Sequence, residues 1–189
     1  MIIIIAGPSG AGKTTLCKIL VENMDNLVYS ISATTRKKRR EEKEGRDYHF
    51  LTEREFKRWE REGRFLEVAK VHNHYYGTPG DMIMEYLSNK KDVIIDIDIQ
   101  GAESIREKIK DVVSVFLLPP NMEETLRRIK KRGMNNKEEI NNRLEDALLE
   151  IEKVRNFDYV VVNNNLEETI LVIKSIIIAE RHSIDRMEV

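Results

Sequence analysis

The feature that most constrains the fold is the segment GPSGAGKT at residues 7–14. It matches the pattern G-x-x-x-x-G-K-[ST], in which glycines let the backbone curl so that its N–H groups point at phosphate oxygens. A run of β-branched residues precedes it at 2–6, and apolar residues with helical spacing follow it from Lys13 to about Met24. A buried strand, a tight loop and a helix in this order predict a phosphate-binding loop within an α/β fold. A plain glycine-rich turn is the alternative, which motif and context together disfavour.

The rest of the chain alternates between strand and helix patterns. Expected strands lie at 28–32, 47–51, 64–71, 93–99, 112–118 and 159–162, and expected helices at 79–89, 103–109, 121–132, 137–155 and 166–181, with another that opens at Thr52. The sequence Thr52-x-x-Glu55 is a capping box. This alternation predicts a mainly parallel sheet covered by helices on both faces. The more highly charged stretch 33–90 is interpreted as an insert on that sheet.

Composition excludes several classes of protein. The chain has 189 residues with 32 Lys and Arg against 33 Asp and Glu, a formal net charge of −1 at pH 7. That balance argues against a general nucleic-acid coat protein, whose affinity depends on excess basic charge. The apolar runs are far shorter than the roughly 20 residues that span a bilayer, so we expect no membrane segment. Cys17 is the only cysteine, which excludes an intramolecular disulfide and fits a reducing, cytoplasmic setting.

Two carboxylates follow the apolar part of the expected strand 93–99. Asp96 and Asp98 are two residues apart, so on a strand they would face the same side. Ligands of open α/β sheets bind at the carboxyl ends of the strands. We therefore expect this acidic pair to help Thr14 hold a cation beside the phosphate loop. The alternative is a strand that simply leaves the core.

A basic run, 36–40, follows the second expected strand. Arginine binds phosphate with a planar fork that lysine lacks, so Arg36 and Arg39 are candidate phosphate ligands. An RNA-binding or nuclear-import patch and a plain solvated loop are the alternatives. Acidic residues at 41, 42 and 44 cancel much of the positive field of this run.

Glu67 is unusual because it lies in an apolar pattern. On an expected strand 64–71, Phe65, Glu67, Ala69 and Val71 would share one face. A carboxylate on such a face needs a hydrogen-bond donor, unless it lies at an edge and reaches solvent.

Several motifs together resemble the guanylate kinase family. They are the phosphate loop 7–14, Ser32-x-Thr-Thr-Arg36-x-x-Arg39, Gly45-x-Asp47-Tyr48-x-Phe50, Phe65-Leu66-Glu67, Tyr75-Tyr76-Gly77-Thr78 and Asp96-Ile97-Asp98-x-Gln100-Gly101. Pro119-Pro120, Arg128-x-x-x-Arg132-Gly133, Ile140-x-x-Arg143-Leu144 and Val162-Asn163 continue the match. The resemblance covers nearly the whole chain in order, and as a set the motifs are highly specific.

The resemblance implies transfer of a phosphoryl group from MgATP to GMP, and to dGMP, in purine nucleotide metabolism. It implies a P-loop NTPase-type parallel sheet formed by 1–32, 91–124 and 148–189, a small mixed α/β GMP-binding insert at 33–90 and a helical lid at 125–147. ATP would be bound by Gly7, Pro8, Ser9, Gly10, Ala11, Gly12, Lys13, Thr14, Thr15 and Asn163. GMP would be bound by Ser32, Arg36, Arg39, Tyr48, Glu67, Tyr76, Thr78 and Asp98. Mg²⁺ would be held by Thr14 and, through water, by Asp96.

The residues expected to act in catalysis are Lys13, Arg36 and the lid arginines Arg128, Arg132 and Arg143. Positioned cations stabilise the charge that spreads over the transferring phosphoryl oxygens. No general base is expected, because the acceptor is already a phosphate anion. The implied partners are ATP and GMP or dGMP, without nucleic acid, membrane or an obligate protein partner.

Two other readings share parts of this pattern. Guanylate-kinase-like scaffolding domains bind peptides without catalysis, but they have lost the working phosphate loop that Lys13 and Thr14 preserve here. A related small kinase with another acceptor would keep that loop and lack the base-reading set Ser32, Glu67 and Asp98.

The sequence departs from the family pattern in three places. Lys37-Lys38 stands where a proline is common, Met134-Asn135-Asn136-Lys137 replaces a more acidic lid tip, and Asn164 stands where the family often has Asp.

Overall fold

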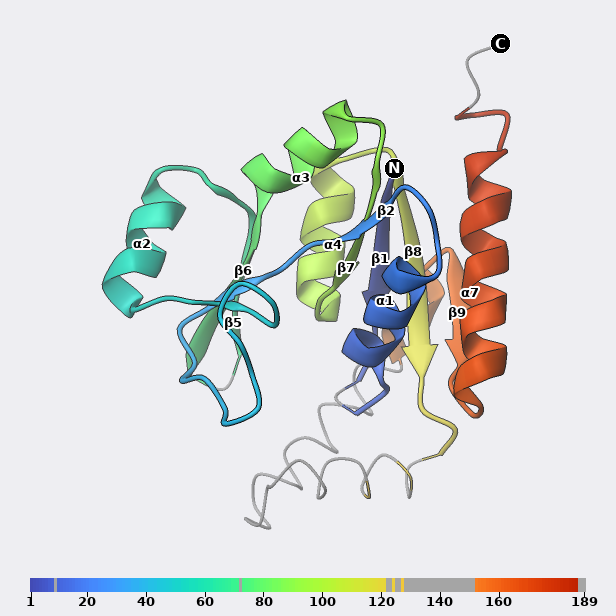
Figure 1. The fold of residues 1–189 in the computed structure, drawn as a ribbon, viewed down its shortest axis with the longest axis horizontal. Coiled ribbons are helices and arrows are strands. Elements are labelled where there is room, and N and C mark those ends of the chain that lie inside the picture. Colours follow the sequence, from blue (N-terminus) through green and yellow to red (C-terminus); the bar gives the residue numbers. More distant parts are fainter. Residues whose placement is uncertain (9, 72, 122–123, 125–126, 128–151, 187–189) are drawn as a thin grey trace.

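The computed structural model describes residues 1–8, 10–71, 73–121, 124, 127 and 152–186. At its centre is a five-stranded sheet in the order β2-β7-β1-β8-β9 (Figure 1). The strands are β1 (Ile2–Ala6), β2 (Leu27–Tyr29), β7 (Asp92–Asp96), β8 (Val112–Leu118) and β9 (Tyr159–Val162). All four pairings are parallel. The predicted parallel sheet is therefore confirmed.

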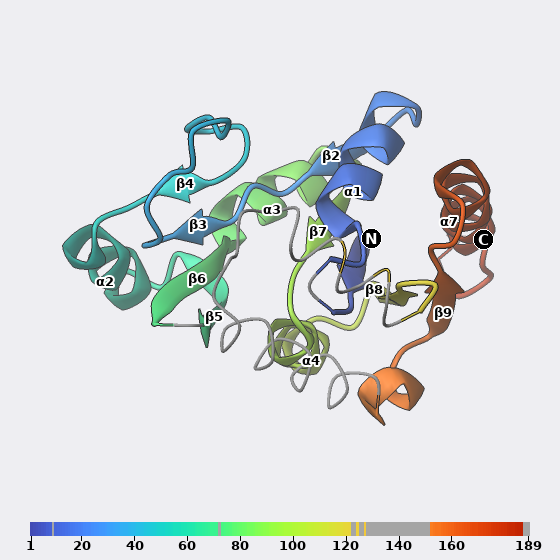
Figure 2. The same cartoon turned by 90° about the horizontal axis from the view of Figure 1, so that it is seen from below.

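Helices cover both faces of this sheet (Figure 2). On one side, α1 (Lys13–Glu22) and α7 (Leu166–Arg181) pack against alternate β1 residues such as Ile3 and Ile5. On the other, α3 (Gly80–Ser88) and α4 (Ile99–Lys108) pack against Ile2 and Ile4. Every residue of β1 is buried, which explains its unbroken run of isoleucines.

A second, four-stranded sheet lies to one side of the first, with the order β4-β3-β6-β5. Its strands are β3 (Ala33–Thr34), β4 (His49–Phe50), β5 (Phe65–Val71) and β6 (His74–Pro79). The helix α2 (Glu53–Arg61) opens with the predicted capping box at Thr52 and Glu55. Its buried Phe56 stacks on Phe65 and Tyr75. The sequence did not predict β3 or β6 as strands.

The expected strand 93–99 is corrected by the structure. β7 ends at Asp96, and the chain turns at Asp98 to begin α4 at Ile99. The Asp98 carboxylate accepts a hydrogen bond from the Gly101 N–H at 2.8 Å, so it caps the helix. Because only Asp96 belongs to the strand, the two carboxylates do not share a strand face, and the helix expected at 103–109 starts four residues earlier.

The expected face of Phe65, Glu67, Ala69 and Val71 is also corrected. The β5–β6 register shifts between Phe65 and Glu67, which makes Leu66 an extra residue in β5. A Cβ built at Gly77 would meet the Phe65 ring at 2.9 Å, while Glu67 pairs with Thr78. Gly77 and Thr78 face opposite sides of β6, so Phe65 and Glu67 also lie on opposite faces of the small sheet.

The remaining elements have the predicted bounds or are shorter than predicted. β8, β9 and α7 have the predicted bounds, whereas β2 and β4 are shorter than expected. A 3₁₀ turn, η1 (Lys153–Asn156), precedes β9. Most of the helices expected at 121–132 and 137–155 lies outside the described residues. Within the described part of the chain, no helix is both long enough and apolar enough to cross a lipid bilayer.

Candidate active site

The phosphate loop joins β1 to α1 and is closed by its own backbone. The Ala11 N–H donates to the Pro8 carbonyl at 3.1 Å, and Gly12 caps α1 with a φ of 99°. That left-handed backbone favours glycine. The Lys13 ammonium donates to the carbonyls of Gly7 and Pro8, which holds its charge beside the loop. A chain that folds this way places backbone donors and one cation at the same helix N-terminus.

Gly7 is required by close packing. Its φ is 135°, and a Cβ there would lie 2.2 Å from the Leu117 carbonyl oxygen of β8. The loop therefore leaves β1 against the neighbouring strand with no room for a side chain.

Asp96 and Thr14 meet as the motif predicted. The Thr14 hydroxyl donates to one carboxylate oxygen of Asp96, and the Tyr29 hydroxyl donates to the other. Burial raises the pKa of Asp96, although these two hydrogen bonds and Lys13 work against the shift. Beside nucleotide phosphates, Mg²⁺ typically has only one or two protein ligands, which are oxygen atoms such as those of a hydroxyl or a carboxylate. The pair therefore fits a magnesium ion that takes its remaining ligands from water and phosphate.

The small sheet presents three of the predicted nucleotide-binding residues on one face. Thr34 pairs with Tyr76 across β3 and β6, and Glu67 pairs with Thr78 across β5 and β6. Because directly paired residues share a face and residues two apart do so too, Tyr76, Thr78 and Glu67 point the same way.

Glu67 and Asp98 form an acidic cluster beside Gly101. The Glu67 side chain is buried, with 6% of the residue exposed, and the Thr78 hydroxyl donates to it at 2.6 Å. A Cβ at Gly101 would lie 3.1 Å from Glu67 Oε2 and 3.2 Å from Asp98 Oδ1, so both carboxylates border the same glycine. Burial, together with the negative charge of Asp98, raises the pKa of Glu67 to about 7, against the opposing bond from Thr78. The carboxylate oxygens of this acidic cluster are acceptors, which suit a ligand that offers N–H donors.

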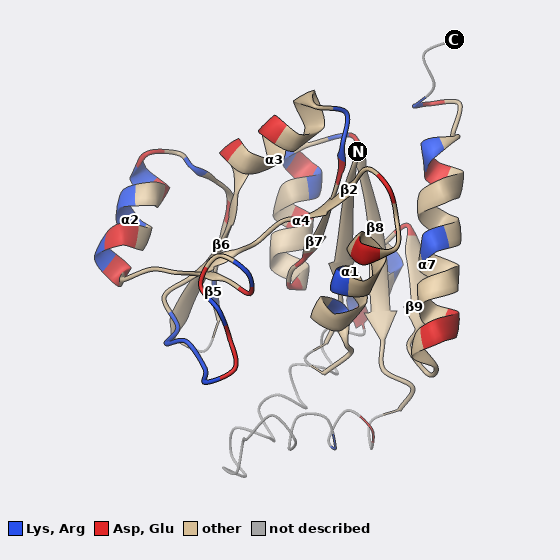
Figure 3. Ribbon diagram, in the orientation of Figure 1, with Lys and Arg blue, Asp and Glu red and all other residues tan. Residues whose placement is uncertain are grey.

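The predicted phosphate ligands of the acceptor lie at the other end of this face. The Arg36 guanidinium stands 5.3 Å from the Tyr48 ring centroid, and the Tyr48 and Tyr76 rings are 6.1 Å apart. Burial raises the pKa of Tyr48, and so does the negative charge of Asp96 in the main sheet. Tyr48 is therefore coupled electrostatically to Asp96, the partner of Thr14. In the loop that carries Arg36, the basic residues 36–40 are followed directly by acidic residues at 41, 42 and 44 (Figure 3).

Glu42 was missed by the sequence analysis as a functional residue. Its carboxylate accepts two hydrogen bonds from Arg36, at 2.8 and 3.0 Å, and a third from the Arg39 N–H at 2.8 Å. Burial alone would lower the pKa of Arg36. The hydrogen bonds and negative charge of Glu42 outweigh burial, so the pKa of Arg36 is raised. Arg39 remains about half exposed, 3.9 Å from Glu42. The sequence analysis interpreted the acidic residues after the basic run only as charges that cancel its positive field. The three-residue spacing of Arg36, Arg39 and Glu42 was the available signal for their contact.

Tyr29 and Gly101 were also missed. Tyr29 ends β2, the edge strand beside β7, which gives its hydroxyl access to Asp96. Gly101 was part of a motif but carried no role.

Asn163 lies beside the phosphate loop. It is buried, and its amide donates to the Ala11 carbonyl at 2.7 Å. Of the other predicted residues, Ser32 is buried just before β3 and Thr15 is exposed on α1. Ser9 and the lid arginines Arg128, Arg132 and Arg143 lie outside the described residues.

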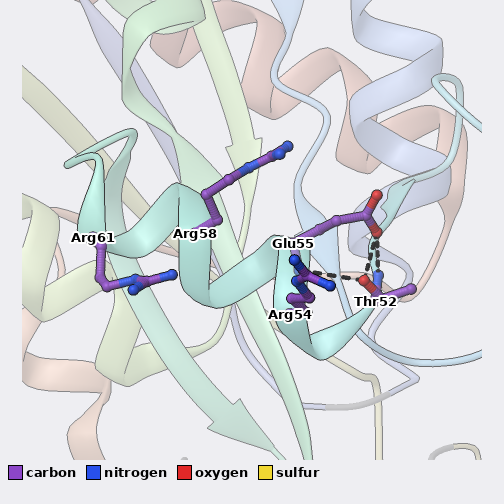
Figure 4. A pocket seen from close by; sticks show the side chains of 5 residues that line it. All are labelled: Thr52, Arg54, Glu55, Arg58 and Arg61. Atoms are coloured by element: carbon purple, nitrogen blue, oxygen red, sulfur yellow. Dashed lines mark hydrogen bonds between the residues drawn. The ribbon is translucent and has the colours of Figure 1, made fainter.

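A surface hollow on α2 is separate from these groups. It is lined by Thr52, Arg54, Glu55, Arg58 and Arg61 (Figure 4), at the far side of the small sheet from α1 (Figure 1). Glu55 belongs to the capping box, and Arg58 lies 3.9 Å from Glu62. The hollow is therefore the solvated face of a charged helix.

Comparisons with known proteins agree with the geometry. A family model described as guanylate kinase matches residues 1–180. The chain is 48% identical over 186 residues to a guanylate kinase of Caldanaerobacter subterraneus subsp. tengcongensis, covering 98% of this chain and 90% of that protein. It is 47% identical over 188 residues to a guanylate kinase of Clostridium perfringens, covering 100% and 87%.

A solved structure shows the same fold. The crystal structure of guanylate kinase from Anaplasma phagocytophilum superposes with a TM-score of 0.82 and 34% identity, over 98% of this chain and 88% of that one. The sequence match, the superposed fold and the residues that meet at the site agree, and this chain belongs to the guanylate kinase family.

Proposed function

We propose that the chain transfers the γ-phosphoryl group of MgATP to GMP, and to dGMP, giving ADP and GDP in purine nucleotide metabolism in the cytoplasm. The observation that carries the proposal is the acidic cluster of Glu67 and Asp98 beside Gly101, on the same molecule as the phosphate loop. The insert 33–90 would hold GMP, and the segment 125–147 would form the lid.

The acidic cluster would favour guanine over adenine. Guanine offers an N–H at ring position 1 and a 2-amino group, so carboxylate acceptors suit it. Adenine has an acceptor at ring position 1 and would leave Glu67 facing a lone pair. Hydrogen-bond pairs of this kind discriminate by about 1–3 kcal/mol each, and a buried unpaired partner rejects the wrong base more strongly.

Positioning and electrostatics would supply the catalysis. Arg36, Arg39, Tyr48 and Tyr76 would orient the GMP phosphate, whose oxygen is already an anion and needs no base. Lys13 and the lid residues Arg128, Arg132 and Arg143 would neutralise charge on the transferring group. Thr14 and Asp96 would hold Mg²⁺, which supplies charge neutralisation at the phosphates.

The test is ADP release from MgATP with GMP, dGMP, AMP, CMP, UMP and a ribose bisphosphate offered in parallel. We expect turnover with GMP and dGMP only, and none in a folded Lys13→Ala variant. Turnover with another acceptor would reassign the substrate. GMP binding without turnover by the wild-type protein would instead identify a non-catalytic binding module.

A further inference from the structure

Asn163 is held on three sides at the junction of β9 and α7. Its Nδ2 donates to the Ala11 carbonyl at 2.7 Å. Its Oδ1 lies 3.2 Å from the Thr169 hydroxyl, whose one hydrogen is shared with the Asn165 carbonyl at 2.7 Å. Its own backbone N–H donates to the Leu118 carbonyl at 2.7 Å. Only 5% of the residue is exposed. The amide is thus fixed in one orientation, with its donor end toward the phosphate loop.

The contact sets the direction of one peptide group. The Ala11 carbonyl and the Gly12 N–H belong to the same planar trans peptide, so they point in opposite directions. Because Asn163 holds the carbonyl on its own side, the Gly12 N–H points away from Asn163. Backbone N–H groups fixed in a shared direction are what makes such a loop bind phosphate.

The absence of a side chain at Gly12 makes room for Asn163. The φ of Gly12 is 99°, and a Cβ there would lie 2.7 Å from Asn163 Nδ2. The second glycine of the motif therefore leaves the space that the asparagine amide fills. Two segments more than 150 residues apart are matched to each other at this point.

We infer that Asn163 is a positioning residue of the phosphate loop, which acts through the Ala11 carbonyl on the triphosphate of the donor nucleotide and not on its base. The inference rests on the proposed function for the identity of the donor. Asn163 was expected among the ATP-binding residues, and the inference assigns it to recognition of the polyphosphate, which all nucleoside triphosphates share.

The test compares two variants of Asn163 with a matched control. Asn163→Asp keeps the size of the side chain but replaces the donor with a carboxylate that repels the carbonyl, and Asn163→Ala removes the contact. Asn164→Ala changes the exposed neighbouring asparagine. Calorimetry measures binding of magnesium tripolyphosphate and of adenosine, kinetics give KM for MgATP and for GMP, and thermal unfolding reports the fold.

We expect both Asn163 variants to weaken tripolyphosphate binding and raise the KM for MgATP by about tenfold, the size of a lost hydrogen bond to a preorganised group. Adenosine binding and the KM for GMP should stay within twofold of wild type, and Asn164→Ala should match wild type throughout. A lower melting temperature with unchanged tripolyphosphate binding would show a purely structural role and overturn the inference. Weaker adenosine binding with unchanged tripolyphosphate binding would overturn it in favour of a base contact.

A second variant protects the test against misfolding. Thr169→Val removes the hydroxyl beside Asn163 Oδ1, together with its bond to the Asn165 carbonyl, and leaves the amide in place. If the Asn163 variants do not fold, this variant should show the same selective loss of tripolyphosphate binding, smaller in size, and no loss would overturn the inference. If the wild type binds tripolyphosphate but turns over no acceptor, the proposed function fails while the positioning role is still measured.

Discussion

Glu67 combines burial, a hydroxyl partner and a neighbouring carboxylate. Burial raises its pKa to about 7, above the value of 4.5 for an exposed glutamate. The folded protein therefore binds a proton at Glu67 more tightly than the unfolded chain does. The resulting contribution to stability is fully present below about pH 4.5 and is lost as the pH rises to about 7.

The variant Glu67→Gln should remove this pH dependence. A pKa difference of this size corresponds to about 3 kcal/mol of unfolding free energy. Relative to wild type, the variant should gain up to that amount between pH 4.5 and pH 7.5. Urea unfolding of both proteins at the two pH values measures the difference. Parallel pH profiles for the two proteins would contradict the assignment.

Glu42 gives a second prediction about a single side chain. Its two hydrogen bonds hold the Arg36 fork in one orientation, so Glu42→Gln should loosen it and raise the KM for GMP by about tenfold. Glu41→Gln, in the exposed neighbouring residue, is the control. Steady-state kinetics at saturating MgATP measure the effect. A lower KM would show that Glu42 competes with the GMP phosphate instead of orienting its ligand.

At the scale of elements, α2 depends on its capping box. Thr52 accepts from the Glu55 N–H, and the Glu55 carboxylate accepts from the Thr52 N–H at 2.8 Å. Thr52→Ala should cost about 1 kcal/mol of unfolding free energy. Because the helix carries Phe56 under the small sheet, a fluorescence signal from Trp59 should follow the loss in urea. Thr52→Ser keeps a capping hydroxyl and should restore most of the stability.

The elements that the sequence predicted well are those with continuous apolar patterns. β8, β9 and α7 each have an apolar run or stripe with clear ends, and the structure reproduces their bounds. β3 and β6 are short and carry polar and aromatic residues, so they have no such run. The end of β7 was misjudged because Ile97 and Ile99 extend the apolar pattern while Asp98 turns the chain.

The parts of the candidate site that could be predicted are those formed by residues close together in the sequence. The phosphate loop is contiguous, and Thr14 and Asp96 follow from strand order. Glu67 lies on β5 of the small sheet, whereas Asp98 caps α4, which packs on the main sheet. Their proximity cannot be predicted from sequence spacing alone. Glu42 and Tyr29 were missed because their roles depend on how side chains turn inside a loop and at a sheet edge.

At the scale of the whole molecule, the two sheets differ in how much core supports them. The five-stranded sheet is packed on both faces by buried clusters, whereas the small sheet has Phe56, Phe65 and Tyr75 beneath it. Stability is therefore expected to be unequal, since regions with fewer buried contacts open at lower free energy. An ion pair joins Lys18 of α1 to Asp47, in the loop between β3 and β4 of the small sheet.

Amide hydrogen exchange should separate the two sheets. Amides of β1 and β7 should be the slowest to exchange, and those of β3 and β4 faster by about a hundredfold or more. Saturating GMP should slow exchange in the small sheet preferentially, because a ligand stabilises the state that binds it. Uniform protection across both sheets, or slowing by GMP confined to α7 and β9, would contradict this picture.

The extra residue in β5 separates two tasks that share one strand. Leu66 packs against the core between the main sheet and α4, and its carbonyl accepts from the Lys108 ammonium. Phe65 and Glu67 on either side keep opposite faces, as they would in a strand without Leu66. Loss of Leu66 alone would therefore weaken the packing of β5 against the core of the main sheet, yet leave the Glu67 carboxylate on the same face of the small sheet. The anchoring of the small sheet and the direction in which Glu67 faces can thus change independently within one hairpin.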